Sequence, residues 1–281
     1  MVKILPDFLI VGAMKSGSTT LMDYLYSHEE VGIPKEEINY FDKDVNYQKG
    51  IDWYSSWFKK YVSKKVIGEK TPAYCYDTKS IGRIQKQNPK MKLVWILRNP
   101  VKRTYSNYWH YIRIGKEILT LKQCLEQENE RIKKDIYKGY FKRSIYADQV
   151  ENYLAYFPME QMHFIIFEDF VKYPKKNLDA LSKFLDIRPT KFTQKKLISN
   201  KGYRPLSIRA EYYARQWFGY GIIHKVIHNI NKLLGSEYVP LDSIIKNELY
   251  KRFEPENKRL EHLLGKDLSC WKNRNNECKI I

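Results

Sequence analysis

The sequence predicts an α/β protein with a central, mostly parallel sheet flanked by helices and a P-loop-like turn after the first strand. Short apolar runs bounded by turn residues alternate with segments of helical periodicity, which is typical of parallel sheets. Of the 281 residues, 43% are hydrophobic, which supports a sizeable core. Because no linker rich in Pro, Gly or Ser divides the chain, we expect one domain spanning residues 1–281.

Four apolar runs rich in Val and Ile predict buried strands, at residues 8–11, 66–68, 93–97 and 164–167. Between and after them, apolar residues recur at steps of three and four, which predicts helices. These helices span residues 19–28, 102–114, 146–156, 178–185 and 244–264. Since ligands of such folds bind beyond the carboxyl ends of the strands, we expect the functional residues in the loops that follow them.

The charge of the chain points to an anionic partner. Fifty Lys and Arg residues against 32 Asp and Glu give a formal net charge of +18, which suits nucleic acid, a membrane surface or a polyanionic small molecule. The lysines are dispersed, however, so a solvated basic surface explains the charge equally well. The short basic clusters lack the interleaved aromatic residues of an RNA-binding strand, and we expect no nucleic-acid partner.

Neither a secretory signal nor a membrane anchor is visible in the sequence. Pro6 and Asp7 interrupt the first apolar stretch, and no apolar run approaches the roughly 20 residues that span a bilayer. We therefore expect a cytoplasmic protein. Cys75, Cys124, Cys270 and Cys278 lack the spacing of a metal site. Free thiols are expected in a reducing compartment, although the last two could pair in an oxidising one.

The stretch PDFLIVGAMKSGSTTLMDYL predicts a strand, a glycine-bearing loop and a helix, the arrangement that presents backbone N–H groups to a phosphate. Nucleoside-triphosphate sites have the pattern G-x-x-x-x-G-K-[ST]. Here the spacing from Gly12 to Gly17 is kept, but Ser18 follows and the lysine is Lys15, inside the loop. The Lys-Ser pair that handles Mg²⁺ and the terminal phosphates is therefore missing. A structural glycine turn with a solvated lysine is the alternative.

A second stretch, KLVWILRNPVKRTYSNYWHY, predicts a strand that ends at Arg98 and a helix that carries Ser106. An Arg fork together with a hydroxyl suits a terminal phosphate. Taken alone, an Arg after a strand is more often part of a surface salt bridge.

The two stretches, in this order, resemble the cofactor signatures of the sulfotransferases that use 3′-phosphoadenosine-5′-phosphosulfate (PAPS). The segments EEINYFD, GEKTPAY and NKGYRP are similar to motifs of the heparan-sulfate-type branch, and RFEPENKRLEHLLGKDLSCW looks like the C-terminal helix of bacterial members. The resemblance covers most of the chain and is weakest over residues 203–245.

The resemblance implies which residues bind PAPS and its product, adenosine 3′,5′-bisphosphate (PAP). The first loop and helix start would hold the 5′-phosphosulfate, the second stretch the 3′-phosphate, and NKGYRP would close over it, with no metal required. The implied residues are Lys15, Ser16, Gly17, Ser18, Thr19, Thr20, Arg98, Ser106, Tyr146 (toward the adenine), Lys201, Gly202 and Arg204.

The resemblance also implies the catalytic residues. Lys15 and Lys70 would stabilise the leaving group, and Glu37 would be the general base. Neighbouring Glu36 is a rival for the base, and a solvated acidic turn is the structural alternative. The heparan-type branch tends to have a His two positions after its Glu, where this chain has Asn39. This difference from the family pattern affects which acceptor we expect the site to take.

Two other function classes compete with sulfuryl transfer. A P-loop kinase is favoured by FIIFED, a strand that would end in a Mg²⁺-binding acid, and the net charge favours a non-enzymatic nucleic-acid binder. His28 and His110 are further candidates for the base because another branch of the family uses a histidine, and both are expected to be packing or surface residues. Tyr74 or Trp53 could line the acceptor cleft.

The sequence does not identify the acceptor, but for a cytoplasmic enzyme we expect a small metabolite rather than a lumenal glycan. The candidates are the hydroxyl or amine of a small metabolite, a sugar or glycan, or a natural product such as an alkaloid. The choice between O- and N-sulfation and the oligomeric state are open as well.

Overall fold

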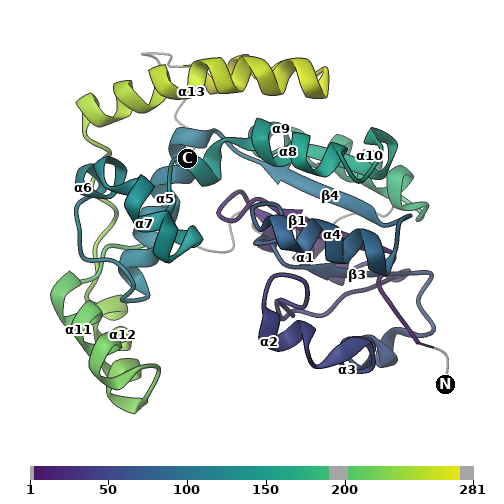
Figure 1. Ribbon diagram of the computed structural model, residues 1–281, viewed down its shortest axis with the longest axis horizontal. Coiled ribbons are helices and arrows are strands. Elements are labelled where there is room, and N and C mark those ends of the chain that lie inside the picture. The colour runs from purple at the N-terminus through teal and green to yellow at the C-terminus, as the bar shows by residue number, and fades with distance from the viewer. Residues whose placement is uncertain (1–2, 190–201, 273–281) are drawn as a thin grey trace. The chain divides into compact units, whose positions relative to one another are not determined.

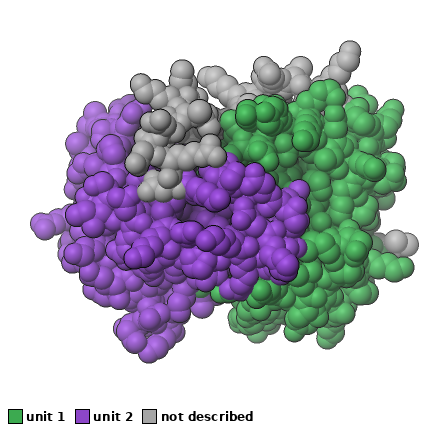
Figure 2. Space-filling model, turned by 90° about the horizontal axis from the view of Figure 1, so that it is seen from above, with its two compact units in different colours: residues 1–98, 146–199 green, residues 99–145, 200–281 purple. Residues whose placement is uncertain are grey.

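The computed structural model describes residues 3–189 and 202–272 (Figure 1). The chain forms two compact units, each built from two separate stretches (Figure 2). The first unit comprises residues 1–98 and 146–199, and the second comprises residues 99–145 and 200–281. The expectation of one domain over the whole chain stays a prediction. Lys201 and Cys278, both named above, lie outside the described residues.

The first unit contains a five-stranded sheet in the order β2-β3-β1-β4-β5, in which every neighbouring pair is parallel. The predicted α/β fold with a parallel sheet is thereby confirmed. The strands are β1 (Phe8–Gly12), β2 (Val31–Gly32), β3 (Val66–Lys70), β4 (Lys92–Leu97) and β5 (Met162–Ile166). The four predicted strands correspond to β1, β3, β4 and β5, while two-residue β2 was not predicted.

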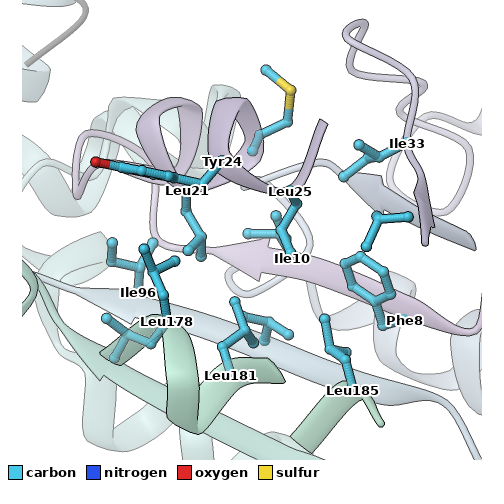
Figure 3. Close-up of a cluster of buried hydrophobic side chains, with 14 of the residues drawn as sticks. Phe8, Ile10, Leu21, Tyr24, Leu25, Ile33, Ile96, Leu178, Leu181 and Leu185 are labelled. Atoms are coloured by element: carbon cyan, nitrogen blue, oxygen red, sulfur yellow. The ribbon is translucent and has the colours of Figure 1, made fainter. Parts of the chain in front are cut away.

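Helices cover both faces of this sheet, as a parallel sheet requires. They are α1 (Ser18–Tyr26), α2 (Asp44–Tyr47), α3 (Gly50–Ser56), α4 (Thr78–Gln87), α8 (Tyr146–Leu154), α9 (Phe167–Lys172) and α10 (Pro174–Leu185), with 3₁₀ turns η1 (Lys59–Tyr61) and η4 (Met159–Gln161). On one face, Phe8 and Ile10 pack with residues of α1 and α10 (Figure 3). On the other, Trp95 meets the ring of Tyr153 from α8.

The pleat of a strand explains how β1 contributes side chains to both faces of the sheet. All five residues of β1 are buried, and successive side chains point to opposite sides. A strand buried on both faces reads as a continuous apolar run rather than an alternating one. This is why FLIVG was recognisable as a central strand from the sequence.

The second unit is described by helices alone, apart from one antiparallel bridge between Arg204 and Ser236. Its helices are α5 (Pro100–Arg113), α6 (Leu121–Glu126), α7 (Glu128–Lys134), α11 (Ile208–Phe218), α12 (Ile222–Leu233) and α13 (Ser243–Leu264), with 3₁₀ turns η2 (Ile136–Lys138), η3 (Lys142–Ser144) and η5 (Ser269–Trp271). A small core joins Val101 of α5 to Leu249 and Phe253 of α13. No helix among the described residues has the length and apolar content needed to cross a bilayer.

Candidate active site

Three cationic residues follow three neighbouring strands of the first unit. Lys70 ends β3, Lys15 lies in the loop after β1, and Arg98 comes directly after β4. The strands are adjacent in the order β3-β1-β4, and Ile10 is in register with Lys70. Because parallel strands end at the same edge of a sheet, the three residues gather where ligands of this fold class bind.

The loop after β1 is shaped by close backbone packing. A side chain at Gly17 would collide with the ring of Phe167, because its Cβ would lie 2.7 Å from a ring carbon. The backbone φ there is +98°, a value that also favours glycine. Lys15 has φ of +69°, which is uncommon for a residue with a side chain and occurs mostly at functional sites.

This loop fits an anionic group. Helix α1 begins at Ser18 with no side-chain cap, and the first N–H groups of a helix have no intrahelical acceptor. Next to them, the hydroxyl of Ser16 is fully buried, and its Oγ has no hydrogen-bond partner among the residues that the structure describes. Buried hydroxyls are normally bonded. Unused donors at a helix N-terminus therefore suit the 5′-phosphate of PAPS.

Arg98 is tied to the same loop. Its Nη1 donates a hydrogen bond to the carbonyl oxygen of Lys15 at 3.3 Å, and its guanidinium lies 5.1 Å from the ring centroid of Phe167. The carbonyl of Arg98 accepts a hydrogen bond from the hydroxyl of Tyr146 at 2.9 Å. Loop and strand end are thus connected through Arg98, and Tyr146 supports its backbone.

The two residues expected to handle protons and the leaving group are in direct contact. Lys70 Nζ lies 2.8 Å from Glu37 Oε1. The Lys70 side chain is only 5% exposed, whereas that of Glu37 is 45% exposed. Lys70 is therefore held in a fixed position by the sheet, and Glu37 is presented to solvent and so to an acceptor. Glu36, the rival candidate, is exposed as well.

Asn39 shapes the turn that carries Glu37. Its φ is +53°, a conformation in which Asn is enriched among residues with side chains. Its Nδ2 donates to the carbonyl of Glu37 at 2.8 Å, and its backbone N–H donates to Thr71 Oγ1 at 3.3 Å. In this chain, Asn39 therefore fixes the backbone of the acidic turn.

Sequence reasoning missed Glu69, the residue before Lys70. Glu69 is fully buried and accepts hydrogen bonds from the hydroxyls of Tyr54, Thr71 and Tyr74, the last two at 2.7 Å. The Tyr74 hydroxyl in turn accepts the N–H groups of Tyr40, at 2.9 Å, and Phe41. Together with the bond from Asn39 to Thr71, these contacts anchor residues 39–41 to β3. A lone Glu inside an apolar strand was the available signal.

Burial raises the pKa of Glu69 to about 7, although the hydroxyls of Tyr54, Thr71 and Tyr74 favour the charged form. The negative charge of Asp42 adds to the rise. Neighbouring Lys70 does not bond to Glu69 but to Glu37, since successive strand residues face opposite sides.

The remaining predicted residues lie as follows. Ser18 and Thr20 are buried on α1 and Thr19 is partly exposed. Ser106 lies on α5, in the second unit, and is partly exposed. Gly202 packs against Tyr238, whose hydroxyl would lie 1.6 Å from a Cβ added there. Arg204 is exposed, and its backbone pairs with Ser236. The assignment of these residues to PAPS stays a prediction.

The alternatives among aromatic and imidazole side chains have structural roles. His28 Nε2 bonds to the carbonyl of Arg188 at 2.8 Å, and its Nδ1 accepts the N–H of Glu30 at 3.0 Å, so the ring ties two loops together. His110 lies in the last turn of α5, beside Tyr111. Tyr74 is fully buried in the Glu69 network rather than lining a cleft, and Trp53 is partly exposed.

Several known proteins are similar to this chain in sequence. The family model described as "Sulfotransferase domain" matches residues 5–203. The chain is 30% identical over 277 residues to heparan sulfate glucosamine 3-O-sulfotransferase 5 of Mus musculus, covering 96% of this chain and 75% of that protein. It is 26% identical to heparan sulfate glucosamine 3-O-sulfotransferase 3B1 of Homo sapiens, covering 94% of this chain and 65% of that protein.

A solved structure is also similar. The crystal structure of a sulfotransferase from Alicyclobacillus acidocaldarius superposes with a TM-score of 0.72 at 25% identity, covering 95% of this chain and 98% of that one.

Proposed function

Given that this chain belongs to the PAPS-dependent sulfotransferase family, we propose that it transfers the sulfuryl group to a sugar hydroxyl of an anionic glycan, with Glu37 as general base. The observation that carries the proposal is the set of three strand-end cations, Lys15, Lys70 and Arg98, beside an exposed carboxylate. Such a set can neutralise a bound anion while a base works at its edge.

PAPS, when bound, supplies an SO₃ group whose transfer, like phosphoryl transfer, depends mainly on positioning and charge stabilisation. Lys15 and Lys70 lie at neighbouring strand ends, where both can stabilise negative charge on the leaving phosphate. Fixed cations in a buried setting need no rearrangement during the reaction. The residues Lys15, Ser16 and Arg98 would hold the nucleotide through its phosphates.

Glu37 would take the proton of the acceptor hydroxyl. A carboxylate is too weak a base for a resting alcohol, so it acts as the hydroxyl proton becomes acidic during attack. The contact with Lys70, at 2.8 Å, directs the Glu37 carboxylate toward the strand ends. One ion pair therefore places the proposed base, Glu37, beside Lys70, the cation proposed to stabilise the leaving group.

The glycan acceptor is supported by charge and by relatives. The net charge of +18 suits a polyanion, and the relatives named above carry heparan sulfate glucosamine in their names. A small natural product, such as an alkaloid, is the alternative acceptor. It would need a more apolar site than the strand-end cations provide.

A transfer assay with labelled PAPS tests both points. Heparan-type oligosaccharides and a panel of small hydroxylated metabolites would be offered to the parent, to Glu37→Gln and to Glu36→Gln as the matched control. We expect transfer to the oligosaccharide, a fall of roughly 100- to 10,000-fold in Glu37→Gln, and near-parent rates in Glu36→Gln. Transfer only to the small metabolites would refute the glycan, and equal rates in both variants would refute the base.

A further inference from the structure

A cluster of potential metal ligands lies in the second unit, beyond the residues that the family model covers. Glu211 comes from α11, and His224 and His228 come from α12. One ligand atom from each lies within 4.8 Å of the other two. Figure 1 shows α11 and α12 as adjacent helices. The cluster falls within residues 203–245, where the resemblance to the family is weakest.

The sequence brings these side chains together in a simple way. His224 and His228 are four residues apart on one helix, so they lie on the same face. The segment FGYG, at residues 218–221, reverses the chain between the two helices, and Gly219 has φ of +56°. This turn places α11 against α12 and brings Glu211 to the histidine face.

The carboxylate of Glu211 is the centre of the cluster. It is fully buried, and its Oε1 lies 2.8 Å from His228 Nδ1 and 3.2 Å from His224 Nε2. Its Oε2 accepts a hydrogen bond from Asn231 Nδ2 at 2.7 Å. Buried carboxylates need hydrogen-bond donors, a positive charge or a metal ion to offset their lost hydration. The contacts that hold Glu211 are two imidazoles and an amide.

The orientation of His224 distinguishes a metal site from a hydrogen-bonded pair. Its side chain is 6% exposed. Within the described chain, neither of its ring nitrogens has a partner in hydrogen-bonding geometry, although Nε2 is near Glu211 Oε1. Buried imidazole nitrogens without hydrogen-bonding partners are unusual in proteins. A metal ion facing the Nε2 lone pair would give that nitrogen a partner.

The surroundings resemble an outer coordination shell. Asn231 orients the carboxylate of Glu211, and its own Oδ1 accepts the N–H of Ser207 at 2.9 Å. The hydroxyl of Tyr203 lies 3.4 Å from His228 Nε2, the nitrogen that faces away from Glu211. Metal-bound histidines and carboxylates are usually held by such second contacts.

We propose that Glu211, His224 and His228 bind a divalent transition-metal ion, preferably Zn²⁺, which joins α11 to α12. Two imidazole nitrogens and one carboxylate oxygen are ligands that suit Zn²⁺, with a fourth position left for water. The His228 side chain is 32% exposed and gives the ion a path to solvent. The ion would stabilise the helical hairpin of α11 and α12.

The first test is Zn²⁺ binding to the untagged full chain, measured by competition with a chromophoric chelator and by elemental analysis. We expect one equivalent of tightly bound metal and a higher midpoint of thermal unfolding with Zn²⁺ than with a chelator. Co²⁺ in place of Zn²⁺ should give the visible absorption of a four-coordinate site.

The variants His228→Gln and Glu211→Gln test the ligands, and His262→Gln, which removes an exposed histidine of α13, is the matched control. Loss of an outer-shell partner typically weakens metal binding about 10- to 100-fold, so loss of a ligand should weaken it by at least that much. His228 is partly exposed, so His228→Gln tests the site even if Glu211→Gln does not fold. Less than one equivalent bound, or unchanged binding in His228→Gln, would overturn the proposal.

Discussion

Two buried carboxyl groups, Glu69 in the first unit and Glu117 in the second, are held by different partners. Glu69 is surrounded by three hydroxyls. Glu117 accepts bonds from Arg131 and from the Tyr140 hydroxyl, at 2.7 Å, and Lys138 Nζ lies 3.5 Å away. Burial raises the pKa of each, but at Glu117 the bond to Arg131 and the charge of Lys138 outweigh it and hold the pKa below 4.5.

The comparison of Glu69 with Glu117 shows that cations have different partners in the two units. In the second unit, cations neutralise a buried acid and so stabilise the fold. In the first, Lys70 stands beside Glu69 in the sequence but contacts Glu37 instead. The acid at the base of the site, Glu69, is satisfied by neutral hydroxyl donors and takes no cation from the strand ends. Four predictions test this contrast.

The largest effect is expected from Lys70→Met. Removing one fixed donor for the leaving group should lower turnover about 100- to 1,000-fold, and release Glu37 from its partner. Steady-state sulfate transfer measures the loss. Lys86→Met, an exposed lysine of α4, is the control and should keep the parent rate. A near-parent rate in Lys70→Met would show that this cation does not act on the reaction.

Glu117→Gln should be the most damaging to stability. It leaves Arg131 and Lys138 near a buried neutral group, and breaking a buried ion pair from one side costs about 3 kcal/mol or more. Because the pKa of Glu117 is lowered by folding, its stabilisation is present above pH 4.5 and is lost as the pH falls below that value. Urea unfolding at pH 7 and pH 4 should show the difference shrinking at the lower pH.

Glu69→Gln should show the opposite pH trend. The pKa of Glu69 rises from 4.5 to about 7 on folding, so its ionisation destabilises the parent progressively as the pH rises through that window. Between pH 4.5 and 7, the unfolding free energy of Glu69→Gln should therefore rise relative to that of the parent, by at most about 3 kcal/mol. Urea unfolding across this range gives the slope. A parallel pH profile for the two proteins would mean that folding does not raise the pKa of Glu69.

The smallest effect is expected from removing single buried hydroxyls. It separates a role in stability from a role in positioning Glu37. Tyr74→Phe removes the hydroxyl that links Glu69 to Tyr40, and Tyr153→Phe removes a buried hydroxyl bonded to the Tyr74 carbonyl at 3.0 Å. Each should cost about 1 kcal/mol of stability. Only Tyr74→Phe should also lower turnover, because it loosens the turn of Glu37. Equal turnover in both would make the Glu69 network purely structural.

The sheet could be predicted from the sequence because its central strands are buried on both faces. FLIVG and KLVWIL therefore stand out as unbroken apolar runs. Strand β2 has only Val31 and Gly32, too few residues to show a period. Pro100 and Pro174 begin α5 and α10, two and four residues before the starts predicted from apolar spacing, because a first turn needs no apolar residue.

Only the site residues that belong to a recognisable sequence motif could be predicted. Lys15, Lys70 and Arg98 were predictable because their motifs resemble those of the family, whereas Glu69 was not, since its role depends on tyrosines distant in the sequence. The metal-ligand cluster is visible in the sequence only in part, as the spacing of four residues between His224 and His228. Its third member, Glu211, could be connected to them only through the packing of α11 on α12.

The most direct test of the central claim is nucleotide binding by calorimetry in the presence of EDTA. The parent should bind adenosine 3′,5′-bisphosphate without Mg²⁺, and more tightly than adenosine 5′-phosphate. Arg98→Ala should weaken the bisphosphate by roughly 10- to 100-fold and remove that preference, whereas Lys15→Ala should weaken both nucleotides. Binding that requires Mg²⁺ and favours ATP, or an unchanged preference in Arg98→Ala, would contradict the assignment of the strand-end cations to PAPS.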